Sequence, residues 1–305
     1  MEIPLVGPGG EPVDLLRTIT SHGVASLPPM LLDEAAGTLE VTLPLPGRRP
    51  RTVVIGPGPP GHARVQVPGR SPGRREAEGI AGAVRHILHL DLDLSGFYAL
   101  AAEDPELAWA ARGAGRMIRS PTVFEDVVKT VCTTNASWGL TTKMVTALVA
   151  NLGHPARDAP DDGWRGRAFP TAEAMAGRDE RFYREVIRAG YRAPSFVALA
   201  RSVAEGAVDL EDLGRASSED VSDDEVEARL LALPGVGPYA AAHVMLTLGR
   251  YSRLILDSWT RPAYARLRGS RKPVSDAGIV RRFRRYGPWA GLAFWLSLTR
   301  AWVPE

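Results

Sequence analysis

The stretch Leu233-Pro234-Gly235-Val236-Gly237-Pro238-Tyr239-Ala240-Ala241 separates two helical patterns and decides the fold of the surrounding chain. Its two glycines predict a tight hairpin between helices, because glycine permits positive φ and the close approach of another backbone. The preceding Leu-Pro fixes the end of the first helix. The second helix would begin with free N–H groups, which favour a phosphate. A turn of this kind also joins ordinary helices, so other residues have to establish its function.

A lone acidic residue, Asp257, ends the apolar run that follows the hairpin helix, in Arg253-Leu254-Ile255-Leu256-Asp257-Ser258-Trp259. A partly buried carboxylate near a phosphate-binding turn indicates chemistry on a nucleotide whose base is flipped out of the duplex. Such a carboxylate would stabilise an oxocarbenium-like sugar and orient a water molecule, as carboxylates do in glycoside hydrolysis. Asp257 is also placed to cap the next helix, and the two roles are compatible.

The composition is that of an ordinary globular protein, with 305 residues, 45% hydrophobic, 24% charged and a formal net charge of +2. This length predicts two or three packed units. The small net charge means that any nucleic-acid surface comes from local clusters. Cys132 is the only cysteine, which excludes an intrachain disulfide and a four-cysteine zinc or iron–sulfur site. The histidines are scattered, so we expect no metal site. With no signal peptide and no membrane-spanning run, we expect a cytoplasmic protein.

Residues 1–75 differ from the rest of the chain in the pattern of their hydrophobic residues. A short amphipathic helix over residues 14–21 and several β-branched or alternating runs predict an antiparallel sheet with a helix against it. The runs are residues 38–43, 52–55 and 63–67. After a Pro/Gly/Arg linker the hydrophobic period becomes 3.6. We predict an α+β, mainly α, fold: an antiparallel β-sheet domain over residues 1–75 and a helical domain over residues 76–305, with its helix-hairpin-helix at about 223–249.

These residues together resemble the helix-hairpin-helix (HhH-GPD) DNA glycosylase superfamily. They are nearest its 3-methyladenine DNA glycosylase II and 8-oxoguanine glycosylase branches, without an iron–sulfur cluster. Residues 233–237 match the family hairpin, and Asp257 falls on the family aspartate. The resemblance covers most of the chain, and the N-terminal strands fit the extra antiparallel β domain of these branches. Further similar segments are residues 124–135, 169–171, 189–193 and 285–293.

The resemblance implies a DNA glycosylase of base excision repair, with Asp257 as its catalytic residue. Such a protein is a monomeric hydrolase that binds double-stranded DNA, flips a damaged base out and hydrolyses the N-glycosidic bond. In a bacterium it would act at the nucleoid. The resemblance also implies a Na⁺ or K⁺ ion at the hairpin carbonyls of Leu233 and Val236, and no other cofactor is expected.

Tyr239 occupies the position at which lyase-bearing members of the family carry a Schiff-base lysine. A Schiff base needs an amine, and the lysines of this chain are Lys129, Lys143 and Lys272. The first two lie far from the hairpin in sequence, and the third lies in a basic loop. We therefore predict a monofunctional enzyme without AP-lyase activity. An aromatic residue here is also typical of the alkyl-base branch, because electron-poor alkylated purines stack on aromatic faces.

The predicted base pocket is mostly aromatic. Its residues are Tyr239, His243, Trp138, Phe294 and Trp295. His243 lies one turn beyond Tyr239 on the same helix face. Phe294 and Trp295 lie in the region where the family closes its pocket. Core packing of the hairpin helix explains Tyr239 and His243 about equally well, and most aromatic residues of such a set pack in the core.

The predicted DNA contacts come from the hairpin, from one asparagine and from two basic residues. They are Gly235, Val236, Gly237, Tyr239, Asn135, Arg271 and Lys272. Arginine-rich runs at residues 266–272 and 281–285 supply further phosphate contacts. In the 8-oxoguanine branch an asparagine enters the gap left by the flipped base, where its donor and acceptor contact the partner base. Asn135 matches it, but an asparagine here also fits as a cap of the helix at Thr141.

The sequence leaves three functions open. The first is a monofunctional glycosylase that excises alkylated purines. The second is a glycosylase for oxidised or deaminated bases such as 8-oxoguanine. The third is a catalytically silent DNA-binding protein that uses only its helix-hairpin-helix.

Overall fold

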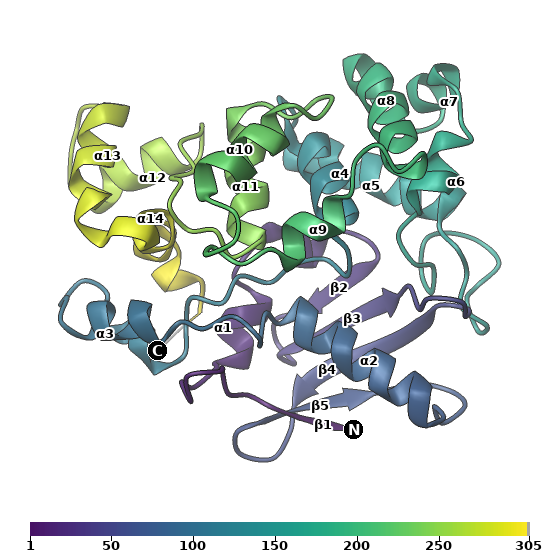
Figure 1. Cartoon of the computed structure of the whole chain (residues 1–305), viewed down its shortest axis with the longest axis horizontal. Helices are drawn as coiled ribbons and strands as arrows, with labels where there is room; N and C mark the ends of the chain where they lie inside the picture. Colours follow the sequence, from purple (N-terminus) through teal and green to yellow (C-terminus); the bar gives the residue numbers. More distant parts are fainter. Residues whose placement is uncertain (304–305) are drawn as a thin grey trace.

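The computed structural model describes residues 1–303 and begins with an antiparallel sheet of five strands in the order β1-β5-β4-β3-β2 (Figure 1). The strands are β1 (Glu2–Pro4), β2 (Met30–Asp33), β3 (Thr38–Leu43), β4 (Arg51–Pro57) and β5 (His62–Gln66). The predicted runs correspond to β3, β4 and β5. The two edge strands were missed, because three or four residues are too few to show a period.

The sheet shares one hydrophobic core with two helices, α1 (Leu15–Ile19) and α2 (Arg74–Ile87). Along β3 the buried side chains of Leu39, Val41 and Leu43 alternate with more exposed ones for most of its length, as the pleat requires. The apolar face of α2 packs into the same core. The domain boundary at residue 75 stays a prediction; α2 begins at this boundary and packs with the sheet.

The remaining described chain is helical, which confirms the α+β, mainly α, fold. The longer helices are α3 (Ser95–Ala102), α4 (Val123–Thr133), α5 (Trp138–Leu152), α8 (Ala193–Ala204), α10 (Asp223–Leu231), α11 (Pro238–Thr247), α12 (Thr260–Leu267), α13 (Asp276–Phe283) and α14 (Ala290–Thr299). The shorter ones are η1 (Gly23–Ser26), η2 (Ala108–Arg112), α6 (Ala172–Ala176), α7 (Glu180–Glu185), η3 (Gly190–Arg192), α9 (Leu210–Arg215), η4 (Arg284–Trp289) and η5 (Arg300–Trp302). Over residues 1–303 none of the helices has the length and apolar character needed to cross a membrane.

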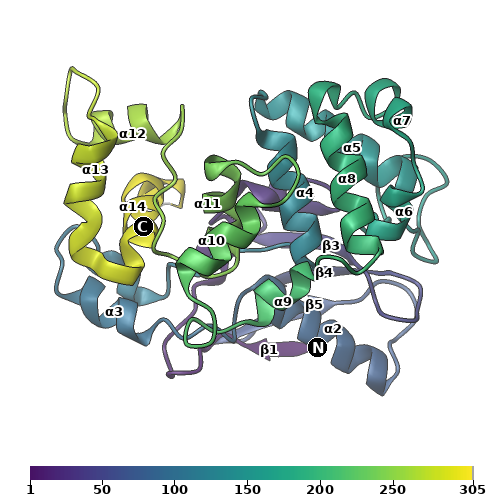
Figure 2. The same cartoon turned by 45° about the horizontal axis from the view of Figure 1, so that its top comes forward.

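The hairpin helices α10 and α11 stand in the middle of the molecule, between α12–α14 on one side and α4–α8 on the other (Figures 1 and 2). From Ala240 to Thr247 every side chain of α11 is buried. Ala240, Ala241 and Val244 belong to the core around α4, α5 and α8. Ala242 and Leu246 belong to a second core, with α3 and α12–α14. One helix therefore forms part of both helical cores, and its short alanine side chains let neighbouring helices approach closely.

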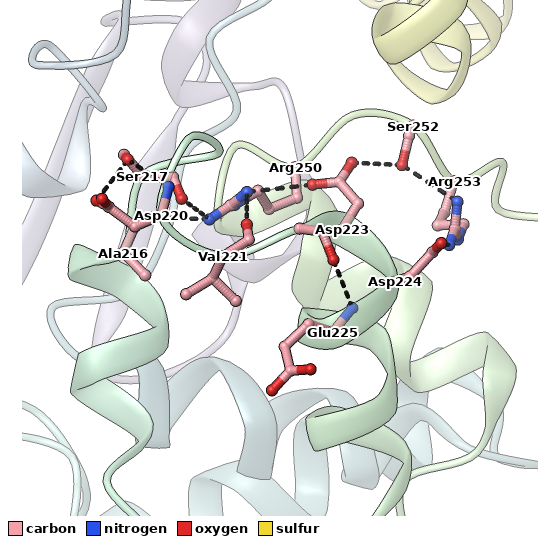
Figure 3. A network of polar contacts seen from close by, with 11 residues as sticks. Ala216, Ser217, Asp220, Val221, Asp223, Asp224, Glu225, Arg250, Ser252 and Arg253 are labelled. Carbon is pink, nitrogen blue, oxygen red and sulfur yellow. Dashed lines mark hydrogen bonds and ion pairs between the residues drawn. The ribbon is translucent and has the colours of Figure 1, made fainter.

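Arg250, just after α11, connects the chain leaving the hairpin to the loop that enters it (Figure 3). Its guanidinium donates to the Asp223 carboxylate at 3.2 Å and to three loop carbonyls, those of Ala216, Ser217 and Val221, at 2.7 to 2.8 Å. Arg250 is buried. Since Asp223 is the first residue of α10, this network fixes the open end of the hairpin.

We predict that Arg250→Met lowers the free energy of unfolding by about 3 kcal/mol, because it removes a buried arginine that donates to the partly buried Asp223 carboxylate and to three loop carbonyls. Urea denaturation measures this change. The matched control is Arg229→Met, which removes an exposed pair with Glu225 and should cost less than about 1 kcal/mol. Equal effects of the two substitutions would contradict the structural role of Arg250.

Candidate active site

A cleft of about 1050 Å³ opens where three parts of the chain meet. These parts are η1, the segment that joins α4 to α5, and the hairpin together with the loop before α12. Most of the predicted site residues line it. They are Asn135, Trp138, Gly235, Gly237, Tyr239, His243, Asp257 and Trp295. The fold therefore brings together residues that the sequence places on four separate segments.

Asp257 lies on the wall of this cleft with 17% of its side chain exposed. Its Oδ1 accepts hydrogen bonds from the N–H groups of Trp259 at 2.8 Å and Thr260 at 2.6 Å. The Asp257 N–H donates in return to Thr260 Oγ1 at 2.8 Å, so Asp257 caps the turn that leads into α12. Its other oxygen, Oδ2, lies 3.9 Å from His243 Nε2.

The environment of Asp257 keeps its carboxylate ionised. Burial by itself raises the pKa, but His243 and the N–H groups of Thr260 and Trp259 outweigh burial and lower the pKa to about 2. The carboxylate is therefore charged at neutral pH, with Oδ1 used in the helix cap and Oδ2 available on the cleft side.

Tyr239 and His243 lie one turn apart on α11, with ring centroids 4.6 Å apart in a T-shaped arrangement. The Tyr239 hydroxyl lies 3.2 Å from Thr133 Oγ1 on α4. Burial raises the pKa of Tyr239, which keeps the hydroxyl protonated. Tyr239 packs against both helical cores and also lines the cleft, so the base-pocket role stays a prediction.

His22, which sequence reasoning grouped with the scattered histidines, lies in the same cleft. Its Nε2 lies 3.1 Å from His243 Nδ1, and its ring centroid lies 5.6 Å from that of Trp295. Burial, with smaller contributions from His243 and Lys129, lowers the pKa of His22 to about 3. The two histidines are 221 residues apart in sequence, so no local pattern could have indicated the pair.

The two adjacent aromatic residues of α14 point in different directions. Trp295 lines the cleft, and its Nε1 donates to the Ser21 carbonyl at 2.9 Å. Phe294 does not line the cleft, contrary to the prediction; it is fully buried against Tyr264 and Phe283. Neighbouring residues of a helix point about 100° apart, and here that angle turns Phe294 into the core while Trp295 faces the cleft.

Exposed side chains form the rim of the cleft. Asn135, with a φ of 46°, donates from Nδ2 to the Tyr191 hydroxyl at 3.2 Å. Trp138 is 49% exposed and Tyr191 is 60% exposed. Asn135 does not cap α5, because Ser137 is the N-cap and accepts from the Leu140 N–H. The Asn135 side chain therefore belongs to the rim, together with Tyr191, whose position the sequence reasoning did not single out.

The two hairpin glycines differ in what the fold requires of them. Gly235 has a φ of 83°, and a Cβ there would lie 2.8 Å from Ser195 Cβ. Gly237 has a φ of −103°, and a Cβ there would meet no atom within 4 Å. No side chain caps α11 at Gly237. The free N–H groups of the first turn thus border the cleft, whereas the side chain of Val236 is buried.

Lys129 lies much closer to the hairpin than its sequence position indicated. Its helix, α4, packs against α11, and Lys129 is among the residues that line the cleft. Its side chain is nevertheless 0% exposed, and Nζ lies 2.6 Å from Glu125 Oε1. Nζ also donates to the Leu27 carbonyl at 3.3 Å. This amine is therefore paired with Glu125 beneath the cleft surface.

Arg271 and Lys272 are exposed in the loop between α12 and α13, away from the cleft lining. Part of the neighbouring arginine runs is already paired. Arg282 forms an ion pair with Glu106, and Arg285 forms one with Asp104. Fewer arginines are therefore free for a ligand than the sequence runs indicated. Within residues 1–303 no group of three or more His, Cys, Asp or Glu side chains is placed to hold a metal ion.

Comparison with solved structures finds the same fold over nearly the whole chain. The 3-methyladenine DNA-glycosylase from Archaeoglobus fulgidus has a TM-score of 0.73 at 22% identity, with 100% of both chains covered. The 8-oxoguanine glycosylase/lyase from Clostridium acetobutylicum was solved in complex with double-stranded DNA that contains cytosine opposite 8-oxoG. It has a TM-score of 0.70 at 19% identity, covering 95% of this chain and 91% of that one.

No protein-family model matches the chain. The structural similarity extends through the sheet and the helices, so the chain has the fold of these DNA glycosylases. The resemblance noted from the hairpin and Asp257 is thereby confirmed at the level of the fold.

Proposed function

We propose that this protein is a monofunctional DNA glycosylase of base excision repair that excises alkylated purines from double-stranded DNA. The observation that carries the proposal is an ionised carboxylate, Asp257, on the wall of a cleft that also borders the uncapped end of α11. The shared fold with known DNA glycosylases supports it. A phosphate on the hairpin N–H groups would hold the strand while the flipped base enters the cleft.

Asp257 has the properties that hydrolysis of an N-glycosidic bond requires. As the bond to the base lengthens, positive charge develops on the sugar, and a fixed anion close by stabilises that charge. Oδ1 is held by two backbone N–H groups, so the carboxylate needs no reorganisation during the reaction. Oδ2 remains on the cleft side for the sugar or a water molecule.

The lining of the inner cleft favours a cationic, alkylated base. Tyr239, Trp259 and Trp295 line it, and a positively charged purine is attracted to the faces of aromatic rings. The imidazole of His22 is neutral, since burial lowers its pKa to about 3, so it does not repel a cation. An alkylated purinium also leaves as a neutral base, which needs no proton from the protein.

The absence of a usable amine supports hydrolysis without strand cleavage. Position 239 is a tyrosine, and Lys129, although near the hairpin, is fully buried and paired with Glu125. A Schiff base requires an unprotonated, accessible amine. Lys129 would have to lose its ion pair and reach the cleft surface before it could attack the sugar.

A second candidate function is the excision of oxidised bases such as 8-oxoguanine. The Asn135–Tyr191 pair on the rim favours it, because a polar pair at the mouth of the cleft could contact the base left unpaired in the opposite strand. A catalytically silent DNA-binding protein is the third. Base-release assays separate the three.

We also propose that the hairpin carbonyls of Leu233 and Val236 bind a Na⁺ or K⁺ ion. Leu233 O accepts one hydrogen bond, from the Val236 N–H at 3.1 Å, and keeps a second lone pair. Oxygen ligands suit a hard cation, and an ion held here would add positive charge where a DNA phosphate approaches the hairpin.

We predict that the protein releases 7-methylguanine or 3-methyladenine from methylated duplex DNA faster than it releases 8-oxoguanine or hypoxanthine from matched duplexes. Asp257→Asn should lower the single-turnover rate by roughly a hundredfold or more, because the anion is lost while the amide oxygen still caps α12. Unchanged release by this variant would refute the role of Asp257. Absence of release from every duplex would favour the DNA-binding function.

We predict no borohydride-trapped adduct between the protein and DNA that contains the preferred lesion, because Lys129, the lysine of residues 1–303 that lines the cleft, is buried and paired with Glu125. Gel electrophoresis after reduction measures the adduct, with a lyase-bearing glycosylase as the positive control. A trapped species would contradict the monofunctional assignment. Trapping that disappears in Lys129→Met, but persists in Lys143→Met, would identify Lys129 as the amine.

We predict that Gly237→Ala weakens binding to a duplex with an abasic-site analogue by about tenfold, because the methyl group obstructs the approach of a phosphate to the N–H groups of α11. Its melting temperature should stay close to that of the wild type, since a Cβ there meets no protein atom. Gly82→Ala, which also meets no atom, is the control with normal affinity. Normal affinity of Gly237→Ala would argue against the phosphate site.

A further inference from the structure

His22, His243 and Asp257 form a chain of side chains whose hydrogen positions can be assigned from their partners. The Val24 N–H points at His22 Nδ1, 3.4 Å away, so Nδ1 is an acceptor. A neutral imidazole carries one proton, so the proton of His22 is on Nε2. That proton faces His243 Nδ1 at 3.1 Å, which makes His243 Nδ1 an acceptor in its turn. The proton of His243 must then be on Nε2, on the side of Asp257.

The Nε2–H group of His243 has no hydrogen-bond partner among residues 1–303, although His243 is only 8% exposed. A buried donor without a partner is costly, and each such group in a protein requires an explanation. Asp257 Oδ2 lies 3.9 Å away, which is too far for a direct hydrogen bond. Two polar atoms this far apart can share one bridging water molecule, and because Nε2 is itself buried here, a small movement of the ring or its neighbours would admit that water.

We propose that His243 Nε2–H and Asp257 Oδ2 together bind the attacking water molecule, and that His22 is a positioning residue that keeps the proton of His243 on Nε2. This inference rests on the proposed glycosylase function. The water oxygen would accept from His243, donate one hydrogen to Asp257, and direct its remaining lone pair to C1′ of the flipped nucleotide.

The step balances for an alkylated purine. The bond from the water oxygen to C1′ forms while the bond from C1′ to the base nitrogen breaks, and the electron pair of that bond leaves with the cationic base, which becomes neutral. The water proton passes to Asp257 Oδ2. A cation, a carboxylate and a water molecule thus become an abasic sugar, a neutral base and a protonated Asp257, which later releases its proton to solvent.

Neighbouring contacts fix the position of His22, as its proposed positioning role requires. It precedes η1 and is its N-cap. The neighbouring Ser21 carbonyl accepts from Trp295 Nε1 at 2.9 Å, which ties this part of the N-terminal segment to α14. The N-terminal part of the chain therefore contributes to the site itself.

Nitrogen-15 NMR of histidine in the full-length protein tests the proton assignment without any DNA, because the shifts of the two ring nitrogens report the tautomer. We expect Nε2–H for both His22 and His243 in the wild type. In His22→Phe we expect His243 to become a mixture of the two tautomers. An Nδ1–H tautomer at His243 in the wild type, or no change in His22→Phe, would overturn the chain.

Single-turnover base release from duplex DNA that contains 7-methylguanine tests the water site. His243→Leu should lower the rate by roughly tenfold to a hundredfold, with unchanged affinity for a duplex with an abasic-site analogue. His243→Gln, which keeps an N–H donor, should recover a large part of the rate. Exposed His154→Leu is the control with the wild-type rate.

The outcomes distinguish this inference from the proposed function. A wild-type rate in His243→Leu, or equal losses in the Leu and Gln variants, would overturn the water site while Asp257 keeps its role. Absence of base release from the wild type would overturn the proposed function itself, and the NMR result would still decide whether the histidine chain exists.

Discussion

The architecture depends on a single helix that is buried on all sides. Because α11 belongs to both helical cores, its side chains from Ala240 onward, apart from His243, are small or apolar. Only its first turns reach the cleft, where Tyr239 and His243 stand one turn apart. The burial that fixes α11 in place thus also fixes where its free N–H groups and its two aromatic site residues lie.

The N-terminal sheet has a part in this arrangement beyond its own core. The turn that follows α1 brings His22 against His243, and Trp295 donates to the carbonyl of the preceding residue. The cleft therefore needs all three parts of the chain. Position 23 requires glycine for the same packing between η1 and α5, since a Cβ there would lie 2.9 Å from the ring of Trp138.

The sequence predicted the features that local patterns encode. The hairpin, the strands β3 to β5 and the cap formed by Asp257 each depend on residues within one segment, and all are present. The features it missed depend on packing. His22 meets His243 only in the folded chain, α4 brings Lys129 to the hairpin, and the helical phase of α14 turns Trp295, not Phe294, to the cleft. Short edge strands and partners distant in sequence leave no periodic signal.

The acidity of Asp257 constrains the chemistry that the cleft can perform. A carboxylate with a pKa of about 2 is a weak base, so it cannot draw a proton from water before the sugar becomes positive. Its contribution must come from its charge beside the developing cation, with proton transfer late, as the water oxygen bonds to C1′. Such an order of events requires a base that leaves without being protonated. A purine that already carries a positive charge meets this requirement, whereas a neutral oxidised purine would need a proton donor for its departure.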